Sequence, residues 1–189
     1  MSSEWESFMQ AALDAAVRDD APRGVNPRVG CLLVKDSRVI GVGQHRGTGT
    51  PHAEIEALRS CSESPAGATA VVTLEPCAHT GRTGPCADAL IESGITRVVF
   101  AMADPTPAAS GGADRLRSAG VEVIDGVLQR EAEAINADWS FMKLHHRPHV
   151  TLKFAGSLDG KVDSSLAERL ILTGPDAQSS VHRLRAQVD

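Results

Sequence analysis

The sequence of 189 residues contains no tyrosine and only six aromatic residues, four Phe and two Trp. Surfaces that bind single-stranded nucleic acid usually stack bases on aromatic side chains, so this composition argues against one. Basic residues are also in the minority, because 19 Lys and Arg stand against 24 Asp and Glu, for a formal net charge of −5. A broad nucleic-acid interface is therefore not expected, although a few local cations or helix N-termini suffice to hold a single phosphate.

Long hydrophobic runs are absent as well. No apolar stretch approaches the roughly 18 residues that suggest a membrane span. The first ten residues, MSSEWESFMQ, have no basic region followed by an apolar one, which argues against a signal peptide. Four cysteines are present, and without a secretory signal they favour metal ligation or free thiols over disulfides. We therefore expect a cytoplasmic protein.

The hydrophobic pattern predicts an α/β fold. A helix reaching about residue 19 precedes two strands, 29–34 and 39–43, that form a hairpin. After residue 50 helices and strands alternate, which is typical of a sheet covered by helices on both faces. The predicted helices are 53–61, 86–93, 113–119 and 129–144, and the predicted strands are 69–73, 97–101 and 121–124. The expected fold is a three-layer α/β/α structure with a mixed, mostly parallel sheet.

The chain changes character after this unit. The segment 145–148 combines charge with a proline and reads as a linker. A new strand is predicted from His149, and a helix is predicted from about Pro175. This last part is too short to bury a core of its own. We therefore divide the chain into a domain of residues 1–146 and an incomplete second domain of residues 147–189.

The strongest chemical signal combines His52, Glu54, Cys77 and Cys86, with eight residues between the two cysteines. A catalytic zinc site keeps three protein ligands and one open position for water, and one His with two Cys meets that count. Cys86 begins a predicted helix and His52 directly precedes one, so the positive helix ends favour thiolate. The sequence thus predicts a zinc site held by His52, Cys77 and Cys86.

Glu54 follows the histidine by two residues, so its carboxylate can reach a metal-bound water without becoming a ligand. Such a carboxylate can accept a proton and return it to the substrate, which makes Glu54 the candidate catalytic residue. Zinc deaminases use the related pattern H-x-E…P-C-x-x-C, from which this sequence departs by its longer cysteine spacing. Alone, the triplet would occur by chance, and cysteines near proline are often merely buried. Their combination and order favour the deaminase site.

Further motifs resemble those of the bacterial riboflavin-biosynthesis deaminases, a family that joins a deaminase domain to an NADPH-dependent reductase domain. The resemblance rests on Asn26-Pro27-Arg28-Val29-Gly30, on His52-Ala53-Glu54, on the run from Thr73 to Cys86 and on Asp104-Pro105. His149 to Gly160 and the later Leu172-Thr173-Gly174 and His182-Arg183-Leu184-Arg185 resemble the opening of the dihydrofolate-reductase-like domain. The rest of that domain, and with it NADPH, would belong to a longer parent.

The resemblance implies a reaction: hydrolytic deamination of 2,5-diamino-6-(5-phosphoribosylamino)pyrimidin-4-one to 5-amino-6-(5-phosphoribosylamino)uracil. It also implies a homo-oligomer and one catalytic Zn²⁺ as the cofactor. The implied substrate-binding residues are Asn26, His45, His79, Arg82, Asp104 and Thr106. An Arg can hold a phosphate through two parallel hydrogen bonds, and a carboxylate can accept hydrogen bonds from ring amino groups.

Several alternatives stay open. Asn26 and His45 could be ordinary loop residues, and Arg82 could be solvated surface. His79 could be a fourth ligand, but no open metal position would then remain. The family usually has Asn where Thr106 stands and Pro where Gly84 stands, so substrate preference could differ. The rival functions are deamination of another base or nucleoside, such as guanine, cytosine or a pyrimidine of specialised metabolism, and a non-catalytic zinc module. Cys31 and Cys61 read as structural.

Overall fold

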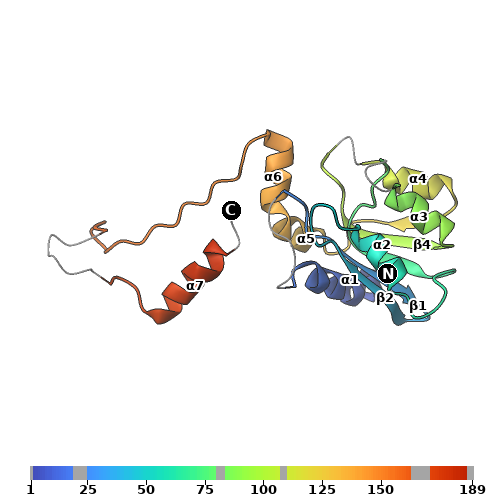
Figure 1. Ribbon diagram of the computed structural model, residues 1–189, viewed down its shortest axis with the longest axis horizontal. Coiled ribbons are helices and arrows are strands. Elements are labelled where there is room, and N and C mark those ends of the chain that lie inside the picture. The colour runs from blue at the N-terminus through green and yellow to red at the C-terminus, as the bar shows by residue number, and fades with distance from the viewer. Residues whose placement is uncertain (1, 19–24, 80–83, 107–109, 163–170, 187–189) are drawn as a thin grey trace. The chain divides into compact units, whose positions relative to one another are not determined.

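The computed structural model describes residues 2–18, 25–79, 84–106, 110–162 and 171–186. The chain forms two compact units, residues 1–148 and residues 149–189. The helices and strands are labelled in Figure 1.

A five-stranded sheet forms the centre of the first unit, with strand order β2-β1-β3-β4-β5. β1 pairs antiparallel with both β2 and β3, whereas β3–β4 and β4–β5 are parallel. The predicted mixed sheet is confirmed, but parallel pairs are two of the four rather than the majority. The strands are β1 (Gly30–Lys35), β2 (Arg38–Gln44), β3 (Thr69–Leu74), β4 (Arg97–Met102) and β5 (Glu122–Ile124).

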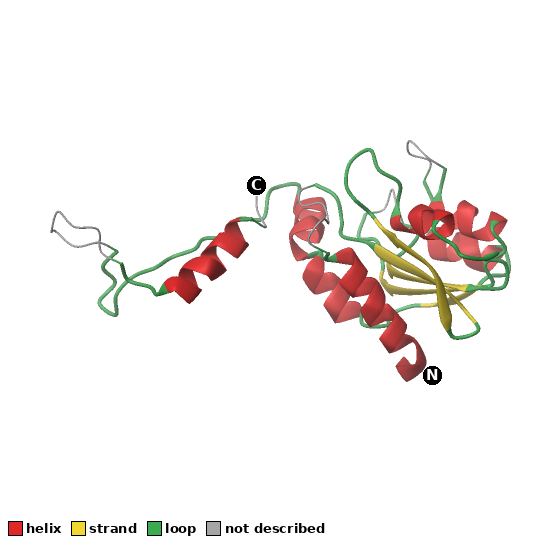
Figure 2. Ribbon diagram, turned by 60° about the horizontal axis from the view of Figure 1, so that its bottom comes forward, coloured by secondary structure: helices red, strands yellow, loops and turns green. Residues whose placement is uncertain are grey.

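Helices cover both faces of this sheet, so the predicted three layers are confirmed (Figure 2). On one face α1 packs on the central strands and α5 on β4, while α2, α3 and α4 occupy the other face. The helices of this unit are α1 (Ser2–Ala16), α2 (Ala53–Arg59), α3 (Cys86–Glu92), α4 (Gly112–Ser118), α5 (Gln129–Ile135) and α6 (Ala137–His145). The buried faces of β1, β3 and β4 form the core between the layers.

Two strand glycines let helices approach the sheet at backbone distance. A Cβ added to Gly30 would lie 2.0 Å from the carbonyl oxygen of Ala12 in α1, and one added to Gly43 would lie 1.9 Å from that of Ala53 in α2. Real Cβ atoms cannot come this close, so neither position has room for a side chain. Gly43 thereby fixes the start of α2, directly after His52, against the sheet.

The helix predicted over 129–144 is interrupted at Asn136. Its side-chain oxygen accepts a hydrogen bond from the backbone N–H of Arg28 at 2.7 Å, and its amide donates to the backbone oxygen of Arg28 at 3.0 Å. The side chain is 2 % exposed. These two bonds tie the junction between α5 and α6 to the segment before β1.

In the second unit, the helix predicted near Pro175 is confirmed as α7 (Pro175–Arg185), but the strand predicted from His149 is absent from the described residues. A strand needs a partner for its backbone groups, and no ladder reaches this segment within the described part of the unit. Its apolar residues are exposed, with Val150 at 78 %, Leu152 at 88 % and Phe154 at 65 %. The segment therefore has apolar residues suited to a strand, but no partner strand among the described residues.

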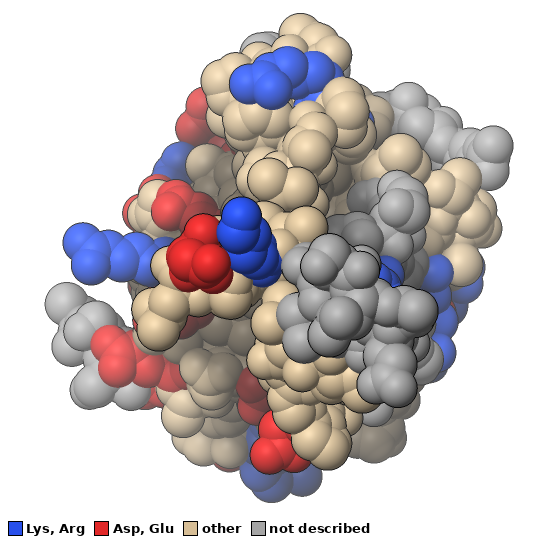
Figure 3. Space-filling model, turned by 90° about the vertical axis from the view of Figure 1, so that its left-hand side faces the viewer, with Lys and Arg blue, Asp and Glu red and all other residues tan. Residues whose placement is uncertain are grey.

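The face of the molecule shown in Figure 3 agrees with the minority of basic residues in the sequence. Lys and Arg side chains are scattered there among acidic and neutral ones, and form no broad basic face among the described residues in view. Helices long and apolar enough to cross a membrane are also lacking in the described segments.

Candidate active site

A pocket of about 430 Å³ opens where β3 and β4 end. The carboxyl ends of neighbouring parallel strands commonly carry the ligand site of an α/β sheet, because the loops that follow them converge there. The pocket is lined by Val25, Asn26, Pro27, Val29, His45, His52, Ala53, Glu54, Leu74, Glu75, Cys77, His79, Asp104, Thr106, Trp139 and Lys143. It therefore gathers residues from the segment before β1, the loops after β2, β3 and β4, the start of α2, and α6.

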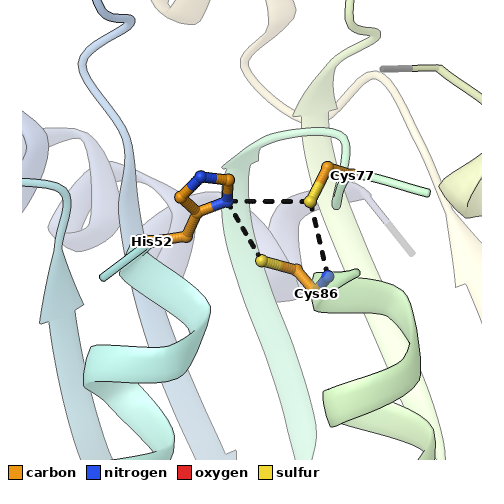
Figure 4. A group of neighbouring side chains, drawn as sticks. All are labelled: His52, Cys77 and Cys86. Atoms are coloured by element: carbon orange, nitrogen blue, oxygen red, sulfur yellow. Dashed lines mark hydrogen bonds between the residues drawn. The ribbon is translucent and has the colours of Figure 1, made fainter. Parts of the chain in front are cut away.

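His52, Cys77 and Cys86 come together at one end of this region (Figure 4). His52 Nδ1 lies 3.2 Å from the sulfur of Cys86 and 3.6 Å from that of Cys77, and the three ligand atoms all lie within 4.8 Å of one another. A tetrahedral zinc ion with the usual Zn–N and Zn–S lengths holds nitrogen and sulfur ligands roughly 3.6 Å apart. The donor set and its spacing therefore fit Zn²⁺.

The local fold brings these three groups together. His52 is the residue before α2, Cys77 follows the end of β3, and Cys86 is the first residue of α3. The backbone N–H of Cys86 points at the sulfur of Cys77, with a distance of 3.4 Å. A helix N-terminus that offers an N–H to a sulfur favours its thiolate form.

The electrostatics of the metal-free group also favour a thiolate. Hydrogen bonding with Cys86 and His52 lowers the pKa of Cys77 to about 4, in spite of its burial. The same hydrogen bond between the two thiols, together with burial, raises the pKa of Cys86. The hydrogen bond to Cys77 raises the pKa of His52, which burial opposes. Of the two cysteines, Cys77 is therefore the one whose thiolate is favoured.

Glu54 lines the same pocket from the first turn of α2 and is 4 % exposed. Burial raises the pKa of its carboxyl to about 7, although its hydrogen bond to backbone N–H and the nearby His52 act in the opposite direction. A carboxyl of this kind can both accept and release a proton near neutral pH. Its side chain is not part of the group of metal-ligand atoms found among the described residues.

Two of the predicted substrate-binding residues are held by loop contacts. Asn26 donates from its side-chain nitrogen to the hydroxyl of Thr48 at 2.7 Å. His45 is 7 % exposed, and its Nδ1 lies 3.0 Å from the carbonyl oxygen of Pro51. This contact places the proton on Nδ1 and leaves Nε2 as the acceptor. Burial lowers the pKa of His45, so the ring is neutral at physiological pH.

Asp104 and Thr106 act as a pair after β4. Thr106 donates to Asp104 Oδ1 through its backbone N–H at 2.8 Å and its hydroxyl at 2.5 Å. Both residues line the pocket. The hydroxyl that the sequence suggested for substrate binding is therefore engaged in orienting the carboxylate of Asp104.

Glu75 is a pocket residue that the sequence analysis missed. Its carboxylate accepts hydrogen bonds from the backbone N–H groups of Asp104, Gly111 and Ala113, at 3.3, 3.1 and 3.0 Å. It follows β3 and thereby fixes both the loop after β4 and the start of α4. Its place directly before Pro76-Cys77 is the only signal that the sequence offered.

Two predicted substrate-binding residues remain, His79 and Arg82. His79 is exposed and lines the pocket, but it does not belong to the metal-ligand group of the described residues. Arg82 lies outside the described residues. Lys143 and Trp139 from α6 also line the pocket, and sequence reasoning missed both. Their four-residue spacing in a predicted helix indicated a shared face, but gave no sign that this face meets the site.

The fold and the site define a zinc-dependent deaminase. In agreement, residues 2–102 match the family model described as the cytidine and deoxycytidylate deaminase zinc-binding region. This match covers more than half of the chain, so the chain belongs to that family. The enzyme class and the zinc cofactor predicted from the sequence are thereby confirmed.

Within this class the chain is similar to riboflavin-pathway proteins, as the resemblance predicted. It is 45% identical over 183 residues to the riboflavin biosynthesis protein RibD of Escherichia coli, covering 96% of this chain and 50% of that protein. It is 43% identical over 183 residues to RibD of Aquifex aeolicus, covering 96% of this chain and 51% of that protein. The chain thus spans about half the length of the curated relatives that it matches.

A solved structure gives the same result. The diaminohydroxyphosphoribosylaminopyrimidine deaminase/5-amino-6-(5-phosphoribosylamino)uracil reductase of Thermotoga maritima superposes with a TM-score of 0.91 at 39% identity. The superposition covers 97% of this chain and 53% of that one. The fold predicted for the first domain is therefore confirmed.

Proposed function

We propose that this protein hydrolyses the amino group of 2,5-diamino-6-(5-phosphoribosylamino)pyrimidin-4-one, giving ammonia and 5-amino-6-(5-phosphoribosylamino)uracil. The observation that carries the proposal is the group of His52, Cys77 and Cys86, since two of its members line the same pocket as the buried carboxyl of Glu54. The names of the RibD relatives and of the Thermotoga maritima enzyme support this substrate rather than another base.

In this proposal His52 Nδ1 and the sulfurs of Cys77 and Cys86 hold one zinc ion. When bound, zinc acidifies a water molecule and stabilises negative charge that develops at the ring carbon. Glu54 takes one proton of the attacking water and gives it to the adjacent ring nitrogen. It then takes the second proton of that water from the hydroxyl on the ring carbon and gives it to the departing amine, which leaves as ammonia. The Glu54 side chain is 4 % exposed, which limits exchange of these protons with bulk water.

The other pocket residues orient the substrate. Asp104, held by Thr106, offers carboxylate oxygens to the ring amino groups, and Nε2 of His45 offers an acceptor. Asn26 lies close enough to Thr48 for both to present hydrogen-bonding groups to a sugar hydroxyl. His79 and Arg82 would contact the ribose phosphate end.

We further propose that residues 1–146 form the deaminase domain and that residues 147–189 correspond to the opening of the reductase-like domain. The relatives are about twice as long as this chain, and the Thermotoga maritima enzyme is named as a reductase as well. NADPH would bind the part of such a protein that is not included here. We also propose that the protein forms a homo-oligomer.

The test is the substitution Glu54→Gln, with zinc content and ammonia release measured on the same samples. We expect wild-type protein to hold about one zinc per chain and to release ammonia from the diaminopyrimidinone nucleotide. The variant should keep its zinc and lose at least about 100-fold in kcat, the lower range for loss of a general acid–base group. Glu56→Gln is the control, because Glu56 lies on the same helix outside the pocket and pairs with Arg46 at 3.7 Å.

Other outcomes would point to the rival functions. The family model is named for cytidine and deoxycytidylate deaminases, so cytidine, deoxycytidylate and guanine should be assayed alongside. Faster turnover of any of these would replace the proposed substrate. A zinc-loaded wild-type protein inactive on all of them would indicate a non-catalytic zinc module. Loss of zinc from the Glu54→Gln variant would make Glu54 a ligand.

A further inference from the structure

Helix α6 contributes a part of the pocket wall that none of the deaminase motifs includes. Trp139 and Lys143 both line the pocket. They are four residues apart in a helix, so their side chains lie on the same face. The junction formed by Asn136 and Arg28 fixes the start of this helix beside the segment that carries Asn26.

Lys143 brings a positive charge to a pocket whose other charged groups are acidic. Among the described lining residues it is the only Lys or Arg, whereas Glu54, Glu75 and Asp104 are carboxylic acids. The ion pairs recorded for the described residues do not include Lys143. Glu75 and Asp104 instead use their carboxylates for hydrogen bonds from backbone and hydroxyl groups. The ammonium group is thus available to a ligand.

Trp139 provides an independent indication of a ligand. The side chain is 6 % exposed, and its indole Nε1 is buried without a hydrogen-bond partner among the described groups. A buried N–H that stays unpaired destabilises the folded protein, so such groups usually have a partner in the functional state. A tryptophan at a pocket wall offers one flat apolar face and one donor, which suits a sugar ring with its hydroxyls.

The pocket also has a direction. Glu54 and Cys77, at 4 % and 8 % exposure, form its buried inner end, whereas Lys143, which lines the same pocket, is exposed to solvent. The reacting ring must reach the inner end, where the proton-transfer and metal-binding groups lie. A phosphate tethered to that ring through a ribose then points away from them, toward the open end, where its charge keeps part of its hydration.

We propose that Lys143 is a specificity-determining residue that binds the phosphate of a phosphoribosyl substrate, and that Trp139 positions the ribose between this phosphate and the ring. The inference rests on the proposed function, and adds α6 to His79 and Arg82 as an element that distinguishes a phosphorylated substrate from the free nucleoside. A lysine is well suited to this task, since its ammonium group offers three donors to phosphate oxygens.

The test compares Lys143→Met and Lys143→Arg with wild type on two substrates, the diaminopyrimidinone nucleotide and its dephosphorylated form. Methionine keeps an unbranched apolar side chain and removes the charge. We expect KM for the nucleotide to rise about 10- to 100-fold in Lys143→Met, the range for a charge-assisted hydrogen bond, with kcat and the KM of the dephosphorylated substrate nearly unchanged. Lys143→Arg should recover most of the loss. Arg130→Met is the control, because Arg130 is exposed on α5 and outside the pocket.

A loss of equal size on both substrates, or no change on the nucleotide, would overturn the proposal for Lys143. Wild-type protein that does not turn over the nucleotide would instead refute the proposed function. In that case the binding of ribose 5-phosphate to the zinc-loaded wild type and to Lys143→Met is compared by calorimetry. Weaker binding by the variant supports the phosphate site, and equal binding overturns it.

Trp139→Phe tests the positioning role separately. This variant keeps an aromatic ring and removes the indole N–H. We expect KM to rise for both substrates, because both contain the ribose, while kcat falls less than KM rises. A change in thermal stability with unaltered KM would make Trp139 a packing residue only.

Discussion

At the scale of single residues, Glu75 shows how a pocket carboxylate can support the site through hydrogen bonds to the backbone, without taking part in the reaction. It accepts three backbone N–H groups, from Asp104, Gly111 and Ala113. These donors lie on both sides of the segment 107–109, so one side chain holds the loop that carries Asp104 together with the start of α4. We infer that Glu75 controls the position of Asp104.

The substitution Glu75→Gln tests this role. A glutamine amide has one acceptor oxygen and one N–H₂ group, so at least one of the three backbone donors would face another donor. We expect the free energy of unfolding to fall by about 1.5–3 kcal/mol, measured by denaturant unfolding, together with a higher KM. Glu92→Gln, on the exposed end of α3, should change neither. If the midpoint of denaturant unfolding were the same for Glu75→Gln and wild type, the proposed role of Glu75 would be contradicted.

The four cysteines should differ sharply in reactivity. Cys31 is fully buried and its burial raises the pKa of its thiol, while burial also raises the pKa of the partly exposed Cys61. In the zinc-loaded protein we expect a maleimide to modify Cys61 slowly and the others not at all. Removal of zinc by a chelator should add Cys77, whose thiol has a lowered pKa, as identified by mass spectrometry of peptides. Labelling of Cys77 at the same rate before and after chelation would argue against zinc ligation.

At the scale of elements, the sequence predicted most of the first unit. The hairpin, the alternation after residue 50 and the helix ends near Cys86 and Ala53 were correct to within a few residues. The break at Asn136 was missed because its partner, Arg28, lies 108 residues earlier. The strand from His149 was wrong for a related reason, since a strand exists only with a partner that local sequence does not reveal.

The contact between β2 and α2 has no room for one additional methyl group. In Gly43→Ala the new Cβ would lie 1.9 Å from the oxygen of Ala53 and 2.4 Å from the backbone nitrogen of Ala57. Helix α2 must therefore move, and His52 and Glu54 move with it. We expect a loss of about 3 kcal/mol or more in unfolding free energy, at or above the upper range for overpacking, and weaker zinc binding. Gly174→Ala, in open space, is the control, and equal stability of the two variants would refute the contact.

At the scale of the whole molecule, the metal site was more predictable than the pocket around it. His52, Glu54, Cys77 and Cys86 carry a motif because their chemistry restricts their spacing. Lys143 and Trp139 carry none, because α6 enters the pocket only through the packing of the first unit. Thr106 illustrates an intermediate case, since its presence at the site was predicted but its contact with Asp104 was not.

The division into two units predicts that the first is stable without the second. A variant ending at His146 keeps the six helices and five strands found in the described residues of the first unit. It loses exposed apolar residues such as Val150, Leu152 and Phe154, which promote aggregation. We expect full zinc content, unchanged ammonia release, a melting temperature within about 4 °C of the longer chain and higher solubility. An insoluble or zinc-free variant would place the boundary elsewhere.

The order of the pocket residues along the chain has a consequence for biosynthesis. The three proposed zinc ligands and Glu54 all lie between residues 52 and 86, whereas the α6 wall comes more than fifty residues later. Since a chain leaves the ribosome from its N-terminus at roughly 5–20 residues per second, the ligands emerge seconds before Lys143 does. Metal capture can thus begin on a nascent chain that cannot yet recognise its substrate.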